Sequence, residues 1–190
     1  EKWWQGPVSG AHETSWLSSV DDVFPRYRGV AWHWRDLDVP EHPHDQGRYL
    51  LRFWAVSYRS DVWVNGVHVG EHESGEDPFV LDVTEAIKPG ATNRVAVRAL
   101  SPGSELIDGL VASEIPAPSG VGSGVGILDS VEFHLVPALW IADLFVRTDM
   151  TGAARIQATL HNSSADSVHG RVVVDIAQKE SSEKLDVAHV

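Results

Sequence analysis

Residues 61–70 read DVWVNGVHVG, and this stretch decides the fold. Asn65-Gly66 separates two alternating apolar runs by two residues, which is the strongest short-range signal for a β-hairpin with a type I′ turn. The register that follows pairs residues across the turn: Val64 with Val67, Trp63 with His68, and Val62 with Val69. We therefore expect all four valines on one face, the core face, with Trp63 and His68 together on the other.

The same two-residue alternation recurs along the chain. It is found in VAWHWRDLDV (30–39), RYLLRFWAV (48–56), PFVLDV (78–83), NRVAVRAL (93–100) and SVEFHL (130–135). Several short strands at this spacing favour an antiparallel sandwich or jelly roll, so the predicted fold class is all-β. Helical pattern is scarce: Asp82 or Thr84 is expected to cap one turn over EAIK, before Pro89-Gly90 ends it.

A second β unit is predicted after a change in composition. From Ser101 to Gly126 the alternation gives way to Gly, Pro and Ser, and such a long run inside a compact domain is usually functional or disordered. Pro137 marks a domain boundary, which gives a jelly-roll domain at 1–137 and a second unit at 138–190. Three segments of the second unit are predicted strands: WIADLFVRTDM (140–150), ARIQATLHN (154–162) and GRVVVDIAQ (170–178). Because an immunoglobulin-like sandwich has roughly 100 residues, we expect a partial sandwich of that kind.

The composition is that of an ordinary globular protein, with 190 residues of which 43% are hydrophobic and 22% charged. With no cysteine, disulfides, thiolate metal sites and cysteine nucleophiles are excluded. A formal net charge of −12 without a Lys/Arg-rich run argues against nucleic acid as a partner. No apolar stretch approaches the roughly 18 residues that span a bilayer, so no membrane partner is expected. Bacterial cytoplasm and secretion both stay open as locations. Eight tryptophans are unusual, and both sugar-binding surfaces and large β cores use them.

None of the candidate catalytic or ligand-binding motifs in the sequence matches an established pattern. The hairpin exit is crowded with potential metal ligands, namely His68, Glu71, His72, Glu73, Glu76 and Asp77. Their residue types suit a metal, but their spacing fits no established motif, and a solvated acidic loop is the alternative. GVGSGVG (120–126) lacks GK[ST], and Ser123 lacks the glycines of a nucleophile elbow, so neither a phosphate loop nor that elbow is predicted. We assign no catalytic residue, no metal site and no cofactor.

Four motifs, taken in order, resemble the N-terminal part of glycoside hydrolase family 2, the β-galactosidase, β-glucuronidase and β-mannosidase group. They are Trp32-His33-Trp34-Arg35, Val62 to Gly70, Phe79 to Thr84, and Val125-Gly126-Ile127 through Leu135. The resemblance covers residues 26–150. It implies a galactose-binding-like jelly roll, then an immunoglobulin-like sandwich, then a TIM barrel on which two Glu residues hydrolyse glycosidic bonds with retention. We expect that barrel to lie outside these 190 residues.

The resemblance implies a non-catalytic accessory region that shapes a sugar pocket and holds the barrel in place. The expected partners are carbohydrate and the TIM barrel of the same polypeptide, and homo-oligomer formation stays open. In the family, a jelly-roll loop reaches the barrel mouth, and by position this is Ser101 to Gly124 here, with Asp108 and Glu114 as carbohydrate contacts. The acidic segment 71–77 is then a strand connection at the rim. Jelly rolls of this kind sometimes hold a structural calcium ion, for which no ligand set is assignable here.

Two other functions stay open. An autonomous carbohydrate-binding module would stack sugar rings on exposed aromatic side chains, for which Trp63, beside His68, is the candidate. Packing against another layer explains Trp63 equally well. A structural sandwich for protein contacts also fits the fold, because a fold does not determine a function.

Overall fold

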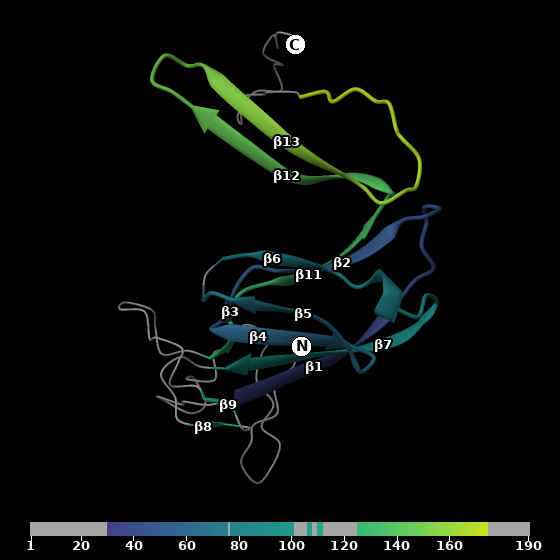
Figure 1. Cartoon of the computed structure of the whole chain (residues 1–190), viewed down its shortest axis with the longest axis vertical. Helices are drawn as coiled ribbons and strands as arrows, with labels where there is room; N and C mark the ends of the chain where they lie inside the picture. Colours follow the sequence, from purple (N-terminus) through teal and green to yellow (C-terminus); the bar gives the residue numbers. More distant parts are fainter. Residues whose placement is uncertain (1–29, 76, 101–105, 108–109, 112–124, 175–190) are drawn as a thin grey trace.

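The computed structural model describes residues 30–75, 77–100, 106–107, 110–111 and 125–174. Apart from one 3₁₀ turn, the regular secondary structure of these residues is β-strand, as predicted (Figure 1). The strands are β1 (Val30–Val39), β2 (Arg48–Phe53), β3 (Val56–Ser57), β4 (Arg59–Val64), β5 (Val67–Glu73), β6 (Phe79–Asp82), β7 (Ala91–Leu100), β8 (Leu106–Ile107), β9 (Leu110–Val111), β10 (Gly126–Ile127), β11 (Val131–Val136), β12 (Leu139–Thr148) and β13 (Ala154–Asn162). A 3₁₀ turn, η1 (Thr84–Ala86), follows β6.

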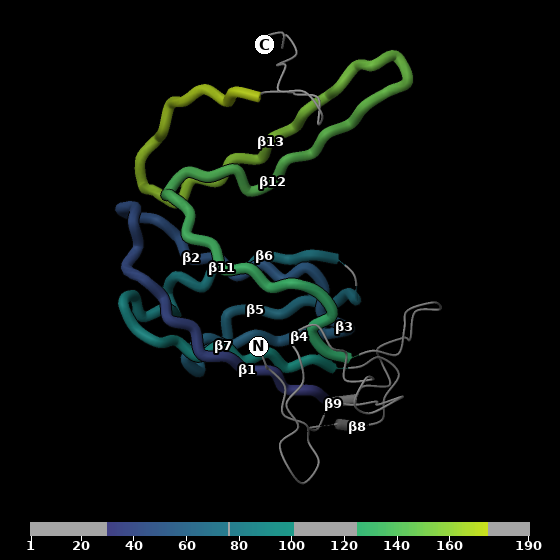
Figure 2. The backbone as a smooth tube through the Cα atoms, turned by 180° about the vertical axis from the view of Figure 1, so that it is seen from behind, coloured from purple at the N-terminus to yellow at the C-terminus, as the bar shows by residue number. Residues whose placement is uncertain are grey.

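Two antiparallel sheets are stacked as a sandwich. One is four-stranded, in the order β1-β7-β4-β5, and the other is three-stranded, in the order β11-β2-β6. Figures 1 and 2 show these two layers one above the other, with the separate β12–β13 hairpin beyond the three-stranded sheet. The predicted all-β sandwich is therefore confirmed.

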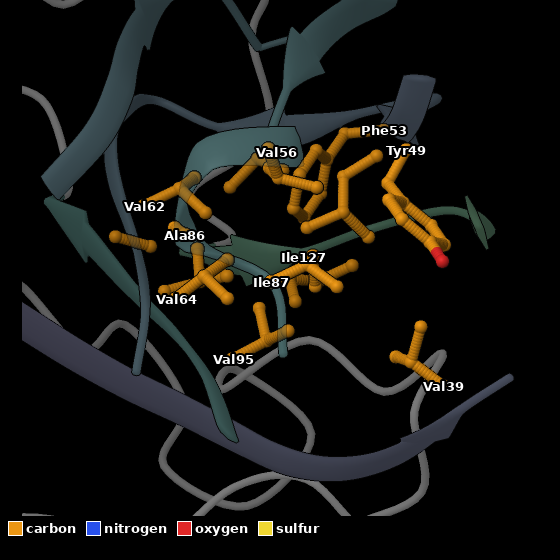
Figure 3. Packing of buried hydrophobic residues seen from close by; sticks show 14 of the residues in the cluster. Val39, Tyr49, Phe53, Val56, Val62, Val64, Ala86, Ile87, Val95 and Ile127 are labelled. Carbon is orange, nitrogen blue, oxygen red and sulfur yellow. The ribbon is translucent and has the colours of Figure 1, made fainter. Parts of the chain in front are cut away.

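The core lies between the two sheets. Alternate residues of β4 and β7 point inward, so Val62, Val64, Val95 and Val97 are at most 1% exposed. Figure 3 shows Val62, Val64 and Val95 in the same cluster as Ile87 and Ile127 from neighbouring segments. Each fully buried side chain of this size stabilises the fold by about 1.5–3 kcal/mol. Burial of these valines therefore determines which face of β4 and β7 points into the core. The side chains at the alternate positions lie on the outer face of the sheet.

The turn of the decisive hairpin forms as predicted. Asn65 and Gly66 have φ angles of 52° and 83°, which are the two positive values of a type I′ turn. Trp63 lies opposite His68 across the strands, also as predicted. The turn chemistry therefore determines which side chains share the outer face near the tip of the hairpin.

Further from the turn, the predicted register is wrong. A β-bulge sets Val62 opposite Gly70 instead of Val69. A Cβ atom at Gly70 would lie 2.6 Å from Cδ2 of Leu81, which is too close for a side chain. The bulge therefore places a glycine where Leu81 of β6 packs against β5. The prediction that all four valines face the core is also wrong, because Val67 is 54% exposed at the turn.

Three further predictions need correction. The single strand predicted over residues 48–56 is divided into β2 and β3, with the exposed Trp54 at the break. The N-cap of η1 is Val83, which makes no side-chain cap bond, so the predicted cap by Asp82 or Thr84 is wrong. Asp82 Oδ1 instead accepts hydrogen bonds from the Thr84 amide at 3.0 Å and hydroxyl at 2.6 Å. The strand predicted over 170–178 is absent from residues 170–174, the part of it that the structure describes.

Candidate functional site

The outer face of the four-stranded sheet carries three tryptophans. Because side chains alternate along a strand, the burial of Ala31 and His33 on β1 sends Trp32 and Trp34 to the outside. The burial of Val62 and Val64 does the same for Trp63 on β4. We call the surface formed by Trp32, Trp34, Trp63 and His68 the aromatic platform.

The platform is continuous because the strand between its tryptophans has a small residue. Trp34 pairs with Ala96 on β7, and Ala96 pairs with Trp63 on β4, so a methyl group lies between the two large rings. Trp32 reaches over β7 to Trp63, with ring centroids 5.2 Å apart and an angle of 37° between the planes. The Trp63 and His68 rings follow at 5.1 Å.

Two charged pairs border the platform. On one side, Asp61 contacts Arg98 at 3.2 Å and His68 Nε2 at 3.5 Å. On the other side, Asp36 accepts two hydrogen bonds from Arg94, both 2.7 Å long. Such a bidentate pair fixes the guanidinium plane and the carboxylate plane relative to each other.

These two pairs differ in exposure. The side chains of Asp61 and Arg98 are 15% and 9% exposed, whereas those of Asp36 and Arg94 are 48% and 64% exposed. The hydrogen bonds from Arg94 hold the pKa of Asp36 below its usual value, and those same bonds raise the pKa of Arg94. The Asp36–Arg94 pair is therefore charged at neutral pH and open to solvent, and it offers donors and acceptors beside the rings.

The predicted site residues separate into two groups. Trp63 and His68 lie together on the platform, in contact with each other. Asp108 and Glu114 fall outside the described residues. Trp32 and the Asp36–Arg94 pair were missed, although alternation along residues 30–39 already places Trp32, Trp34 and Asp36 on one face of a strand.

The acidic hairpin exit has mainly structural contacts. Glu71 forms an ion pair with Arg59 at 3.0 Å, and the His72 ring stacks on Phe79 at 4.3 Å. Glu76 is outside the described residues. Within the described ranges, no group of three or more His, Asp or Glu side chains is arranged to hold a metal ion. The same part of the chain contains no helix long and apolar enough to cross a membrane.

Comparison with known proteins identifies the class. Residues 13–115 match the family described as glycosyl hydrolases family 2, sugar binding domain. The chain belongs to this family, which confirms the resemblance seen in the four sequence motifs.

The relatives include several β-glucuronidases. The chain is 33% identical to the β-glucuronidase of Canis lupus familiaris over 100 residues, which are 47% of this chain and 15% of that protein. It is 28% identical to the β-glucuronidase of Sus scrofa over 193 residues, covering 86% of this chain and 29% of that protein. The chain therefore spans less than a third of the length of these curated relatives.

A solved structure supports the fold. The Ruminococcus gnavus β-glucuronidase in complex with N1-substituted uronic isofagomine aligns with a TM-score of 0.67 at 19% identity. The alignment covers 84% of this chain and 33% of that chain. At this level of identity the two proteins share a fold.

Proposed function

We propose that this chain is the accessory region of a larger family 2 hydrolase that cleaves β-glucuronides. The observation that supports it is the family match over residues 13–115, in a chain that spans only 15–29% of the mammalian β-glucuronidases it resembles. A polypeptide of this kind carries its catalytic Glu pair on a TIM barrel, outside these residues. The accessory region supplies a rigid sandwich against which that barrel is positioned.

The sugar pocket is then completed by a loop of the sandwich. The segment from Ser101 to Gly124 follows β7, and in this proposal it extends to the barrel mouth with Asp108 and Glu114 as contacts for sugar hydroxyls. A carboxylate can accept hydrogen bonds from two neighbouring hydroxyls, which suits it to a sugar. The partners are therefore carbohydrate and the catalytic domain of the same polypeptide.

The test compares this chain with a polypeptide that joins it to the family 2 barrel. Both are assayed with the p-nitrophenyl β-glucuronide, β-galactoside and β-mannoside. We expect the longer polypeptide to have the highest kcat/KM on the glucuronide, and this chain alone to hydrolyse none of the three. A preference for the galactoside would contradict the proposed substrate, and hydrolysis by this chain alone would contradict the accessory role.

Loop variants test the positioning of sugar. Asp108→Asn and Glu114→Gln in the longer polypeptide should each raise KM by about tenfold, the equivalent of about 1.4 kcal/mol, because a charged acceptor is lost. Asp143→Asn on β12 is the matched control, and its KM should stay within about twofold. Unchanged KM in both loop variants would remove these two residues from the site.

A further inference from the structure

The β12–β13 hairpin has two faces of different chemical character. Side chains alternate along each strand, and the face that carries Val146 is apolar. On the opposite face the register pairs Phe145 with Gln157 and Arg147 with Arg155, and we call these four residues the arginine face. Because one face of an antiparallel sheet packs on a core, the apolar face is the one that the predicted second β unit would bury. The arginine face is then its outer surface.

Arg147 and Arg155 are like charges directly opposite each other. Cross-strand pairs of this kind destabilise a hairpin, and a two-stranded hairpin is only marginally stable in water. Within the described residues, neither guanidinium forms an ion pair or a hydrogen bond, and that of Arg147 lies 5.8 Å from the centroid of the Phe145 ring. Asp149, the nearest carboxylate along the chain, accepts hydrogen bonds from backbone amides of its own turn instead. The described residues thus supply no anion to either arginine.

The arginine face has the composition of a protein interface. Both of its arginines are exposed, and Phe145 beside them is 52% exposed. In the sandwich, by contrast, Arg59, Arg94 and Arg98 each contact a carboxylate. Arginine and aromatic side chains are enriched at the centres of protein interfaces. Unpaired arginines beside an exposed ring therefore suit a partner that brings both a carboxylate and an apolar group.

We propose that the arginine face docks an acidic segment of the catalytic part of the same polypeptide, with a carboxylate bridging Arg147 and Arg155 and an apolar side chain covering Phe145. This inference rests on the proposed function, because it requires the larger hydrolase. It names the surface and the chemistry by which that protein holds the accessory region. A carboxylate accepts two parallel hydrogen bonds from an arginine. Placed between the two guanidinium groups, it replaces their repulsion by two attractions.

Charge and chain length favour a partner within the same polypeptide. The chain has a net charge of −12, so a free polyanion or a second copy of the chain experiences a net repulsion as it approaches. A segment of the same polypeptide is held close at a high effective concentration and does not have to associate from solution. The chain corresponds to only 29% of the Sus scrofa β-glucuronidase, so the proposed hydrolase has most of its residues elsewhere.

Hydrogen exchange of the β12 and β13 amides, measured in this chain and in the longer polypeptide, tests the docking. In this chain, Arg155→Gln should raise the protection of these amides by about threefold, because it removes the repulsion from Arg147. In the longer polypeptide the same change should lower their protection by about tenfold, because it removes a contact to the carboxylate. A role of Arg155 within the hairpin alone would shift both proteins in the same direction. Arg155→Lys keeps the charge but not the guanidinium, so its loss in the longer polypeptide should be smaller.

Arg171→Gln is the matched control. It makes the same change in net charge, and Arg171 is exposed and lies beyond β13. This variant should leave the protection of the hairpin unchanged in both proteins. Circular dichroism shows whether each variant folds, and Arg147→Gln decides the matter if Arg155→Gln does not fold.

Several results would overturn the docking. Unchanged protection in the longer polypeptide with Arg155→Gln would remove the contact, and an equal decrease with Arg171→Gln would reduce it to a general effect of charge. Decreased protection in this chain alone would place the partner of the arginines within these 190 residues. Sedimentation of this chain detects a second copy: dimers that Arg155→Gln abolishes would replace the catalytic part as the occupant.

The glucuronide assay keeps this proposal separate from the proposed function. A longer polypeptide that does not hydrolyse the glucuronide contradicts the proposed function. An active one whose hairpin protection is the same in the parent and in Arg155→Gln contradicts only the docking of the arginine face.

Discussion

At the scale of the residue, His33 is a titratable group buried in the sandwich, so its protonation affects the stability of the fold. Its side chain is 2% exposed on the inner face of β1, and its Nε2 has no hydrogen-bond partner among the described residues. Burial lowers its pKa from 6.5 to about 4, because the charged imidazolium loses its hydration there. The neutral form is therefore part of the sandwich core.

This pKa predicts how stability depends on pH. Between about pH 6.5 and 4 an unfolded chain binds a proton at this position that the folded chain does not bind. The free energy of unfolding should thus fall as the pH falls below 6.5, by about 3 kcal/mol at and below pH 4. Urea unfolding at a series of pH values measures the change.

The contribution of His33 is isolated by a variant. His33→Leu removes the titration and keeps an apolar side chain in the core, so its stability should fall less steeply over the same pH range. The exposed His44→Leu is the control and should keep the parent slope. Equal slopes in the parent chain and in His33→Leu would show that burial does not penalise this imidazolium.

At the scale of the element, a buried amide network joins the hairpin turn to β7. Asn93 is 0% exposed, and its Oδ1 accepts hydrogen bonds from the Lys88 amide and from Asn65 Nδ2, both at 2.7 Å. Its Nδ2 donates to the carbonyls of Lys88 and Ala91 at 2.9 and 2.8 Å. Asn65 Oδ1 in turn accepts from the Arg94 amide at 3.0 Å. The turn residue therefore has a second role that its φ angle alone does not reveal.

A double-mutant cycle measures this network. Asn93→Ala should lower the free energy of unfolding by about 3 kcal/mol, because several buried polar groups lose their partners. Asn65→Ala and Asn93→Ala should together cost about 1–2 kcal/mol less than the sum of the two single changes, since both remove the same bond. The exposed neighbour Thr92→Ala should cost only about 0.5 kcal/mol. Additive effects of the two asparagine variants would contradict the network.

The sequence predicts individual strands and turns better than it predicts which strands lie next to each other in the sheets. Alternation locates most strands, and the type I′ turn places Trp63 opposite His68, because both signals are local. The bulge at Gly70 depends on Leu81 of another sheet, a contact that local pattern does not contain. The pairing of β1 with β7, which brings Trp32 to Trp63, joins strands about sixty residues apart in the chain. Half of the candidate site was therefore predictable, and the other half required the sheet order.

At the scale of the whole molecule, the β12–β13 hairpin is built differently from the sandwich. Its register and bulge place a row of apolar residues on one face, which includes Ile141, Leu144, Val146, Ile156, Ala158 and Leu160. Ile141, Leu144 and Val146 are 55%, 55% and 50% exposed. A two-stranded hairpin is marginally stable in water unless another layer covers its apolar face. The division into units at 1–137 and 138–190 stays a prediction, which the relative stability of the hairpin and the sandwich can test.

Hydrogen exchange of this chain should separate the two units. The amides of β12 and β13 should exchange at least about a hundredfold faster than those of β4 and β7, whose opening requires loss of the shared core. Leu144→Ser should leave the melting temperature of the sandwich unchanged, whereas Val97→Ser, at a position that is 0% exposed, should lower it by about 10 °C or more. Equal protection in the hairpin and the sandwich would mean that the two units unfold together. A decrease in the sandwich melting temperature in Leu144→Ser would lead to the same conclusion, because the substituted side chain would then have to contribute to a common core.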